Sequence, residues 1–366
     1  MFRKVRLRLA LGALVVALLV IGAYPVRTSE VSVISTDRFV LYIPRSVAVR
    51  PDVLDYMLSS MHKCLDFVEA FFAHSLRARI CHLWEDALPT LGDSPGSCIC
   101  KPGSERHEVH ETFRTLPTNP SDVDVRAFTW IHEYTHCVLY EVFGALPPLV
   151  DEGVACMIAD DLFERNSYAQ AAIMLTAGEL PSLVALANWV NHAARAWRFD
   201  AWVNYSAAAS LVSFIRDEYG RDAIIRMCER MPDCRVASWE CIPSMVMTAL
   251  EETAGIKLDR LEAAWRQRID STEIDSQFRL GRVAAVRLLK HLHSSPDLDS
   301  LIFLSGRAGK SIGSFWNEFF GLQQMAAWFG TDRAGDMTEE ELREQIDELH
   351  VKADKLRRAL LYGNGE

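Results

Sequence analysis

Two apolar segments stand at the centre of the chain: Phe128-Thr-Trp-Ile-His-Glu-Tyr-Thr-His-Cys137 and, after a Gly-Ala-Leu-Pro-Pro turn, Leu149-Val-Asp-Glu-Gly-Val-Ala-Cys156. In the first segment His132 and His136 are four residues apart. On an α-helix this spacing puts both imidazoles on one face, one turn apart. Two imidazoles arranged in this way can hold one zinc ion at about 2.0–2.1 Å.

Two glutamates near the histidines have the residue type and spacing of a catalytic base and a third zinc ligand. Glu133 follows the first histidine, so its carboxylate is turned away from a shared ion but can reach a water molecule beside it. This is the H-E-x-x-H arrangement of zinc peptidases, in which the glutamate is the general base. A catalytic zinc ion also needs a third protein ligand and an open fourth position. Glu152, sixteen residues after His136, is the best candidate for the third ligand.

The motif from His132 to His136, followed by Asp-Glu-Gly-Val-Ala, resembles the gluzincin group of metallopeptidases, and in particular the peptidase MA-like family with its thermolysin-like active site. In that family a Glu-Gly-x-Ala segment supplies the third zinc ligand, which the resemblance assigns to Glu152. Residues 205–220 are similar to the family's next helix, and residues 258–266 to its closing helix. The likeness covers roughly residues 31–270 and is tight only at 132–155.

The resemblance also points to Tyr205. The similar family often has a tyrosine where this helix begins, and a phenol is a neutral donor near pH 7 that suits a tetrahedral oxyanion. The alternative is that Tyr205 only packs beneath the site. One position departs from the family: the residue one turn after the glutamate ligand, which is often acidic and orients a histidine, is Cys156 here. Asp160, two turns after the ligand, is the other candidate for that task.

The segment patterns predict an α+β fold, with a β-rich part over residues 30–120, a mainly helical part over 121–270 and the zinc site between them. The central helix is predicted to begin with a capping box of Ser121 and Asp124 and to stop at Gly144. Strands are predicted over 31–43, 77–84, 98–100 and 107–113, and helices over 52–73, 122–143, 150–164, 168–177, 205–219, 223–231, 243–253 and 258–269.

A second pair of histidines, His107 and His110, lies in the last predicted strand. Their spacing of three does not fit the metal motif, and in a strand the two side chains point to opposite faces. We therefore expect a solvated edge strand rather than a second metal site. Gluzincins commonly pair the substrate backbone with an edge strand of their sheet, so the resemblance gives this strand a role in substrate binding.

Composition places the chain among ordinary globular proteins. It has 366 residues, of which 49% are hydrophobic and 24% charged, and a formal net charge of −10. This charge argues against nucleic acid, and against an anionic membrane surface, as the main partner. Residues 271–366 lie beyond the resemblance and are predicted to form a helical C-terminal extension, whose last helix packs on its own domain. The oligomeric state is left open.

The first residues, 1–29, have the pattern of a signal anchor or a signal peptide. Arg3, Lys4, Arg6 and Arg8 precede residues 9–26, which carry no charge. That length lies between a signal-peptide core and a spanning helix, and the pattern favours an uncleaved transmembrane anchor. The positive end should stay in the cytoplasm, so the rest of the chain is expected outside it, membrane-anchored, or secreted if the segment is cleaved.

Nine cysteines are consistent with an oxidising compartment, and their odd number leaves at least one without a partner in the same chain. Cys137 and Cys156 lie in the two central segments and are explained by burial alone. A cysteine-rich zinc site is the second interpretation of the thiols, but no paired C-x-x-C spacing supports it.

The sequence therefore predicts a zinc-dependent peptidase that acts on a peptide or protein substrate. Zinc would be held by His132, His136 and Glu152, with Glu133 as the base and Tyr205 as the donor to the oxyanion. Two alternatives remain: an inactive peptidase-like module that binds a partner and has a structural zinc ion, and a zinc hydrolase of a non-peptide substrate. Because no motif for capture of an amino terminus is present, endopeptidase action is favoured.

Overall fold

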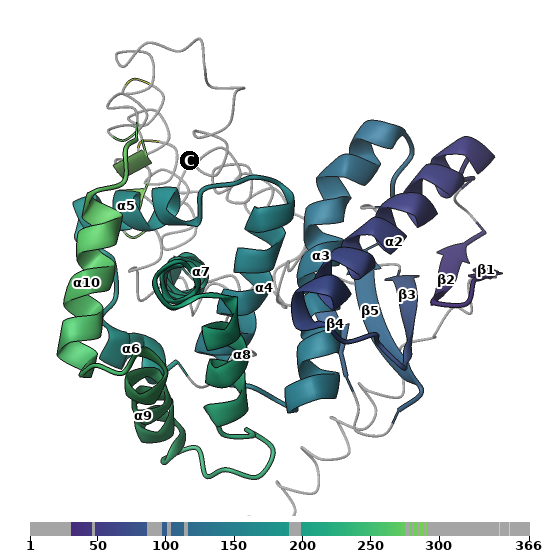
Figure 1. The fold of residues 1–366 in the computed structure, drawn as a ribbon. Coiled ribbons are helices and arrows are strands. Elements are labelled where there is room, and N and C mark those ends of the chain that lie inside the picture. Colours follow the sequence, from purple (N-terminus) through teal and green to yellow (C-terminus); the bar gives the residue numbers. More distant parts are fainter. Residues whose placement is uncertain are drawn as a thin grey trace, which may run out of the picture.

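The computed structural model describes residues 31–45, 48–85, 97–100, 104–112, 116–189 and 199–274, with a few isolated positions between 279 and 351. These residues form the predicted α+β fold, a small mixed sheet followed by a helical lobe (Figure 1). The predicted signal segment at 1–29 and nearly all of the predicted extension at 271–366 lie outside the described residues. Within the described ranges, no helix combines the length and the apolar character needed to cross a membrane.

The sheet has five strands in the order β1-β2-β3-β5-β4. Its centre, β2, β3 and β5, is parallel, and β1 and β4 join antiparallel at the two edges. The predicted strand over 31–43 is two strands separated by a turn. The strands span Val31–Ser35 (β1), Phe39–Pro44 (β2), Arg79–Glu85 (β3), Ser97–Ile99 (β4) and Arg106–Thr112 (β5).

The expectation of a solvated edge strand at His107 and His110 is wrong. The strand in question, β5, lies between β3 and β4, and the short strand β4 takes the edge instead. His107 is only 3% exposed, because it belongs to the face of the sheet that packs against helices. Strand order depends on contacts that the local alternation of polar and apolar residues does not encode.

One face of the sheet forms the core with two helices, α2 (Pro51–Phe72) and α3 (Pro120–Phe143). Alternate residues of each strand point to this face. The ring of Phe39 lies 5.6 Å from that of Tyr134 on α3, centroid to centroid. Each fully buried apolar side chain contributes about 1.5–3 kcal/mol. The fully buried residues of this face are Phe39, Leu41, Ile80, His82 and Val109.

Helix α3 begins two residues earlier than predicted. Asn119 is its N-cap and Asp122 its partner, and the two residues form a reciprocal capping box. Pro120 occupies the first helical turn, where its missing N–H costs nothing. The predicted capping box at Ser121 and Asp124 is therefore wrong in position. The stop signal is confirmed, since Gly144 ends the helix with a φ of 85°.

The helical lobe surrounds one central helix, α7, which is seen end-on in Figure 1. Helices α4, α5 and α8 pack against it. The short helix α6 was not predicted, and α7 extends back to Phe199, so Tyr205 lies within the helix rather than at its beginning. The bounds are Pro148–Leu162 (α4), Ser167–Ala177 (α5), Leu183–Ala187 (α6), Phe199–Tyr219 (α7), Arg221–Arg230 (α8), Ile242–Ala254 (α9) and Leu258–Asp270 (α10).

Gly153 sets the distance between α4 and α7. A Cβ atom at this position would lie 2.7 Å from Val212 Cγ2 and 3.0 Å from the backbone oxygen of Ala208. Only glycine therefore permits this approach, which brings α7 alongside the α4 segment that carries Glu152.

A buried polar network joins the sheet to α3. The carboxylate of Glu111 on β5 accepts hydrogen bonds from Trp130 Nε1 and Arg126 Nη2, both at 2.7 Å. His82 on β3 lies 3.3 Å from the same carboxylate through Nδ1, and its Nε2 lies 2.7 Å from the Tyr134 hydroxyl. Burial raises the pKa of Glu111, but His82 and Arg126 outweigh it and leave this pKa below its ordinary value. The network fixes α3 at several points along its length.

Gly153→Ala should destabilise the protein. The added methyl group forces α4 and α7 apart, and overpacking of this kind lowers the free energy of unfolding by about 1–3 kcal/mol. This loss should appear although alanine is the better helix former by about 1 kcal/mol. Chemical denaturation of the variant, and of Gly153→Ala combined with Val212→Ala, measures the effect. The two substitutions should couple favourably, because the second removes one of the two clashes. A variant as stable as the parent would contradict the assignment.

Glu111→Gln should cost about 3–5 kcal/mol near neutral pH, because it removes the buried negative charge that Arg126 and His82 contact. The folded-state pKa of Glu111 is lowered. Its stabilisation is therefore complete above the unfolded value of about 4.3 and is lost as the pH falls through the lower folded value. Denaturant unfolding at several pH values should show a shallower acid loss in Glu111→Gln than in the parent. Glu108→Gln, on the other face of β5, is the control and should leave the acid loss unchanged.

Candidate metal centre

Three predicted ligand atoms from α3 and α4 meet at one point. His132 Nε2 lies 3.1 Å from His136 Nε2 and 3.1 Å from Glu152 Oε2. The distance from His136 Nε2 to Glu152 Oε2 is 3.4 Å. The two imidazoles come from successive turns of α3, and the glutamate comes from the first turns of α4 across the short turn at 144–147.

These distances fit a tetrahedral zinc ion. Two ligand atoms at about 2.0–2.1 Å from zinc, separated by a tetrahedral angle, lie about 3.3–3.4 Å from each other. The three observed separations, 3.1, 3.1 and 3.4 Å, are close to that value. Two imidazole nitrogens and one carboxylate oxygen are also a donor set that zinc accepts.

A carboxylate from α4 orients one of the ligands. His136 Nδ1 lies 2.9 Å from Asp151 Oδ1, so with an ion at the centre the ring would donate its Nδ1 proton to Asp151 and present the Nε2 lone pair to the ion. Burial lowers the pKa of His136, but Asp151 and Glu152 outweigh it and raise this pKa well above its ordinary value.

The other histidine, His132, has a weaker partner. Cys156 Sγ lies 3.7 Å from His132 Nδ1, so a thiol takes the place where the similar family often has an acid. Asp160, the other predicted candidate, instead accepts a hydrogen bond of 2.8 Å from Ser167 Oγ. Burial raises the pKa of Asp160 to about 6.

Tyr205 reaches the centre through the glutamate ligand. Its hydroxyl donates a 2.9 Å hydrogen bond to Glu152 Oε1, the oxygen that is not directed at the imidazoles. Its ring lies 6.4 Å from that of His132 and 5.3 Å from that of Trp189, centroid to centroid. Burial and then the charge of Glu152 raise the pKa of Tyr205, so the phenol is a neutral donor at physiological pH. The hydrogen bond fixes the orientation of the Glu152 carboxylate.

Glu133 is buried, with 5% of its surface exposed. Burial raises its pKa, and the nearby histidines only partly offset that effect. A carboxylate with a raised pKa is a stronger base than one in water. The raised pKa of Glu133 is the direction of shift that a general base near neutral pH requires.

The centre is open on one side. The side chains of His132 and His136 are 16% and 13% exposed, whereas that of Glu152 is 8% exposed. Solvent therefore reaches the imidazoles, as a catalytic zinc site with an open position requires.

The structure brings together all five of the residues predicted for the site, namely His132, Glu133, His136, Glu152 and Tyr205. Sequence reasoning missed Asp151 as the partner of His136. Its signal was present, because Asp151 directly precedes the glutamate ligand in Leu-Val-Asp-Glu-Gly. Adjacent residues of a helix project about 100° apart, so the two carboxylates can flank one imidazole.

Comparison with known proteins assigns the chain to no family. The chain matches no protein-family model, no curated protein and no solved structure. The resemblance of the motif to gluzincins is thereby neither supported nor contradicted. Any function proposed for the site rests on its residues and their arrangement.

Proposed function

We propose that the chain is a zinc-dependent peptidase of gluzincin type. The observation that carries the proposal is the convergence of His132, His136 and Glu152 on one point, beside the buried base Glu133. Zinc bound by these three residues would lower the pKa of a water molecule to about 7 and polarise the scissile carbonyl.

Glu133 then acts as general base and general acid. It accepts a proton from water as the water oxygen attacks the carbonyl carbon. It later delivers this proton to the amide nitrogen, so the C–N bond breaks and the amine leaves neutral. Such proton transfer contributes typically about 10²–10⁴-fold to the rate.

A peptide substrate is favoured by the position of β4. In the part of the sheet that the structure describes, β4 is an edge strand, and it lies beside α3. An extended peptide can add to such an edge through backbone hydrogen bonds. The resemblance implies that an edge strand binds the substrate, and this role therefore falls to β4 rather than to the strand of His107. The residues around Ile99, which is 43% exposed, would form one wall of the substrate site.

The location of the enzyme is also part of the proposal. The basic and then uncharged pattern of residues 1–29 would keep the zinc domain outside the cytoplasm, anchored to the membrane or secreted after cleavage. A peptidase at that location would meet extracytoplasmic peptides or proteins.

Glu133→Gln separates catalysis from metal binding. We expect it to keep the zinc content of the parent and to lower the rate of cleavage of an unstructured protein by at least about 10²-fold, because the base is lost. His132→Ala, His136→Ala and Glu152→Ala should each lose the zinc of this site, because each removes one of three ligands. Elemental analysis beside a cleavage assay with and without a chelator measures both effects. Glu164→Gln, which changes an exposed carboxylate just after α4, is the control and should change neither.

Two outcomes would overturn the peptidase proposal in different ways. A parent that keeps zinc at this site but cleaves no peptide in broad substrate panels would favour the binding module or a non-peptide hydrolase. A parent that holds no zinc at this site after reconstitution would remove the metal centre and the peptidase together.

Tyr205→Phe tests whether the phenol positions the ligand or donates to the oxyanion. Since its hydroxyl contacts Glu152, we expect zinc affinity to fall by about 10–100-fold, the usual effect of losing a residue that orients a ligand. Competition with a chelator measures this affinity. An unchanged affinity with a kcat lowered by about 10²–10³-fold would instead assign the hydroxyl to the oxyanion. Tyr168→Phe, whose hydroxyl contacts Asp217 away from the centre, is the matched control.

A further inference from the structure

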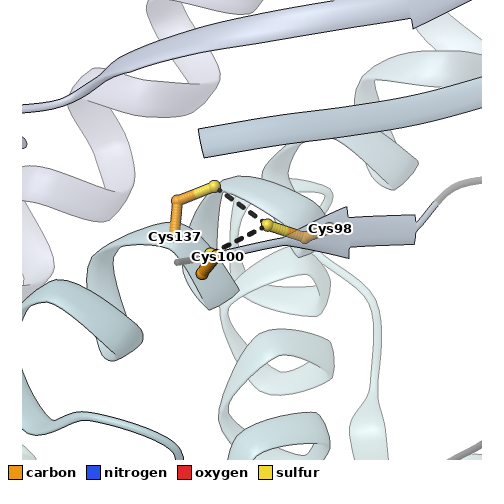
Figure 2. Close-up of side chains that lie close together, drawn as sticks. All are labelled: Cys98, Cys100 and Cys137. Atoms are coloured by element: carbon orange, nitrogen blue, oxygen red, sulfur yellow. Dashed lines mark hydrogen bonds between the residues drawn. The ribbon is translucent and has the colours of Figure 1, made fainter. Parts of the chain in front are cut away.

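A cluster of three thiols lies on the sheet side of α3, apart from the candidate metal centre. Cys98 Sγ is 3.1 Å from Cys100 Sγ and 3.2 Å from Cys137 Sγ. Figure 2 shows the three side chains converging, two from the β4 segment and one from α3. Cys98 and Cys100 reach the same face because they alternate along an extended chain. Below, Cys98, Cys100 and Cys137 are called the thiol cluster.

The strand register adds an imidazole to this cluster. The pairs Cys98–Val109 and Ile99–Glu108 place the next residues, Cys100 and His107, opposite each other. His107 lies on the face of β5 that packs on α3, where its ring is 6.4 Å from that of Tyr140. It is only 3% exposed, and neither ring nitrogen has a hydrogen-bond partner.

Such a histidine needs an explanation, because a buried polar group without a partner costs about 1–3 kcal/mol. The nearest carboxylate oxygen, Glu141 Oε2, is 3.8 Å from Nε2, beyond hydrogen-bond distance. A cation shared with the thiols would give the ring nitrogen a ligand role and remove this cost.

From this geometry we propose a second metal site, distinct from the peptidase centre, that binds a thiophilic divalent cation such as zinc. Its ligands are Cys98, Cys100, Cys137 and His107. Three thiolates and one imidazole are a ligand set of closed structural zinc sites. The site ties the edge strand β4, which has few residues of its own to bury, to the helix that carries the peptidase motif.

The thiol cluster fits a cation better than a disulfide. A disulfide joins two sulfurs at about 2.0 Å and would leave the third thiol and His107 unused. In a tetrahedral zinc site with bonds of about 2.3 Å, sulfurs lie about 3.8 Å apart. The present separations of 3.1 and 3.2 Å reach that value by an opening of about 0.6 Å, which small side-chain rotations provide.

Cobalt(II) separates the two metal sites, because only thiolate ligands give an intense thiolate-to-cobalt charge-transfer absorption. The full chain is reduced, stripped of metal and titrated with cobalt(II). The parent should bind two equivalents and develop this absorption. Cys137→Ser should lose the absorption and one equivalent. His132→Ala should lose one equivalent and keep the absorption, so failure of the peptidase centre is distinguishable from failure of this site.

Two further variants complete the test. Cys241→Ser, which removes an exposed cysteine outside the cluster, should keep both equivalents and the absorption. His107→Ala should keep the absorption but bind the cation more weakly. Because the absorption is read on the parent itself, a variant that does not fold leaves the test intact. Absence of the absorption in the reduced parent overturns the proposal. So does a peptide containing a disulfide within the thiol cluster in protein isolated without reductant, if that protein holds no cation there.

Discussion

Helix α3 packs against other elements on two sides, and a third side stays open to solvent. Helix α3 meets the sheet through Trp130 and the buried carboxylate of Glu111, and it meets α4 through the ligand set around His132. The contact with the sheet fixes the position of α3, and the contact with α4 depends on that position. Because a displacement of about 1 Å can cost catalysis about 10²-fold, the rigidity of α3 on its buried side would be a condition for the proposed chemistry on its open side.

Charge is distributed unevenly around this helix. Near the candidate metal centre the carboxylates of Glu133, Asp151 and Glu152 lie close together, and Glu133 has a raised pKa because it is buried. The pKa of His136 is raised as well, but by the charges of Asp151 and Glu152, which outweigh its burial. An accumulation of carboxylates in a buried place is costly unless a cation compensates it. A divalent ion between the imidazoles and Glu152 would supply this compensation and would leave Glu133, which is not a ligand, to work as a base.

Local signals were enough to predict most of the helices and the meeting of His132, His136 and Glu152, and they failed where distant segments meet. His132 and His136 are one turn apart on one helix, and Glu152 follows across a short turn, so sequence spacing determines their geometry. The internal position of the strand of His107 depends instead on strand order, which a local pattern of alternation does not encode. The thiol cluster escaped prediction for the same reason. Its spacing, two residues on a strand and a third on a helix 37 positions later, matches no short linear motif.

The two proposed sites differ in the chemical hardness of their ligands. They also lie on different sides of α3, although His136 and Cys137 are neighbours in sequence. Successive residues of a helix project about 100° apart, so His136 faces α4 and Cys137 faces β4. Imidazole and carboxylate ligands with an exposed side suit an exchangeable water, whereas thiolates against a sheet suit a permanently closed ion. A short edge strand gains little from its own hydrophobic burial, so a cross-link there would stabilise an element that apolar packing holds weakly. That element, β4, is also the strand that an extended substrate would meet. Fixing β4 to α3 would therefore hold the substrate in a constant position relative to the base Glu133.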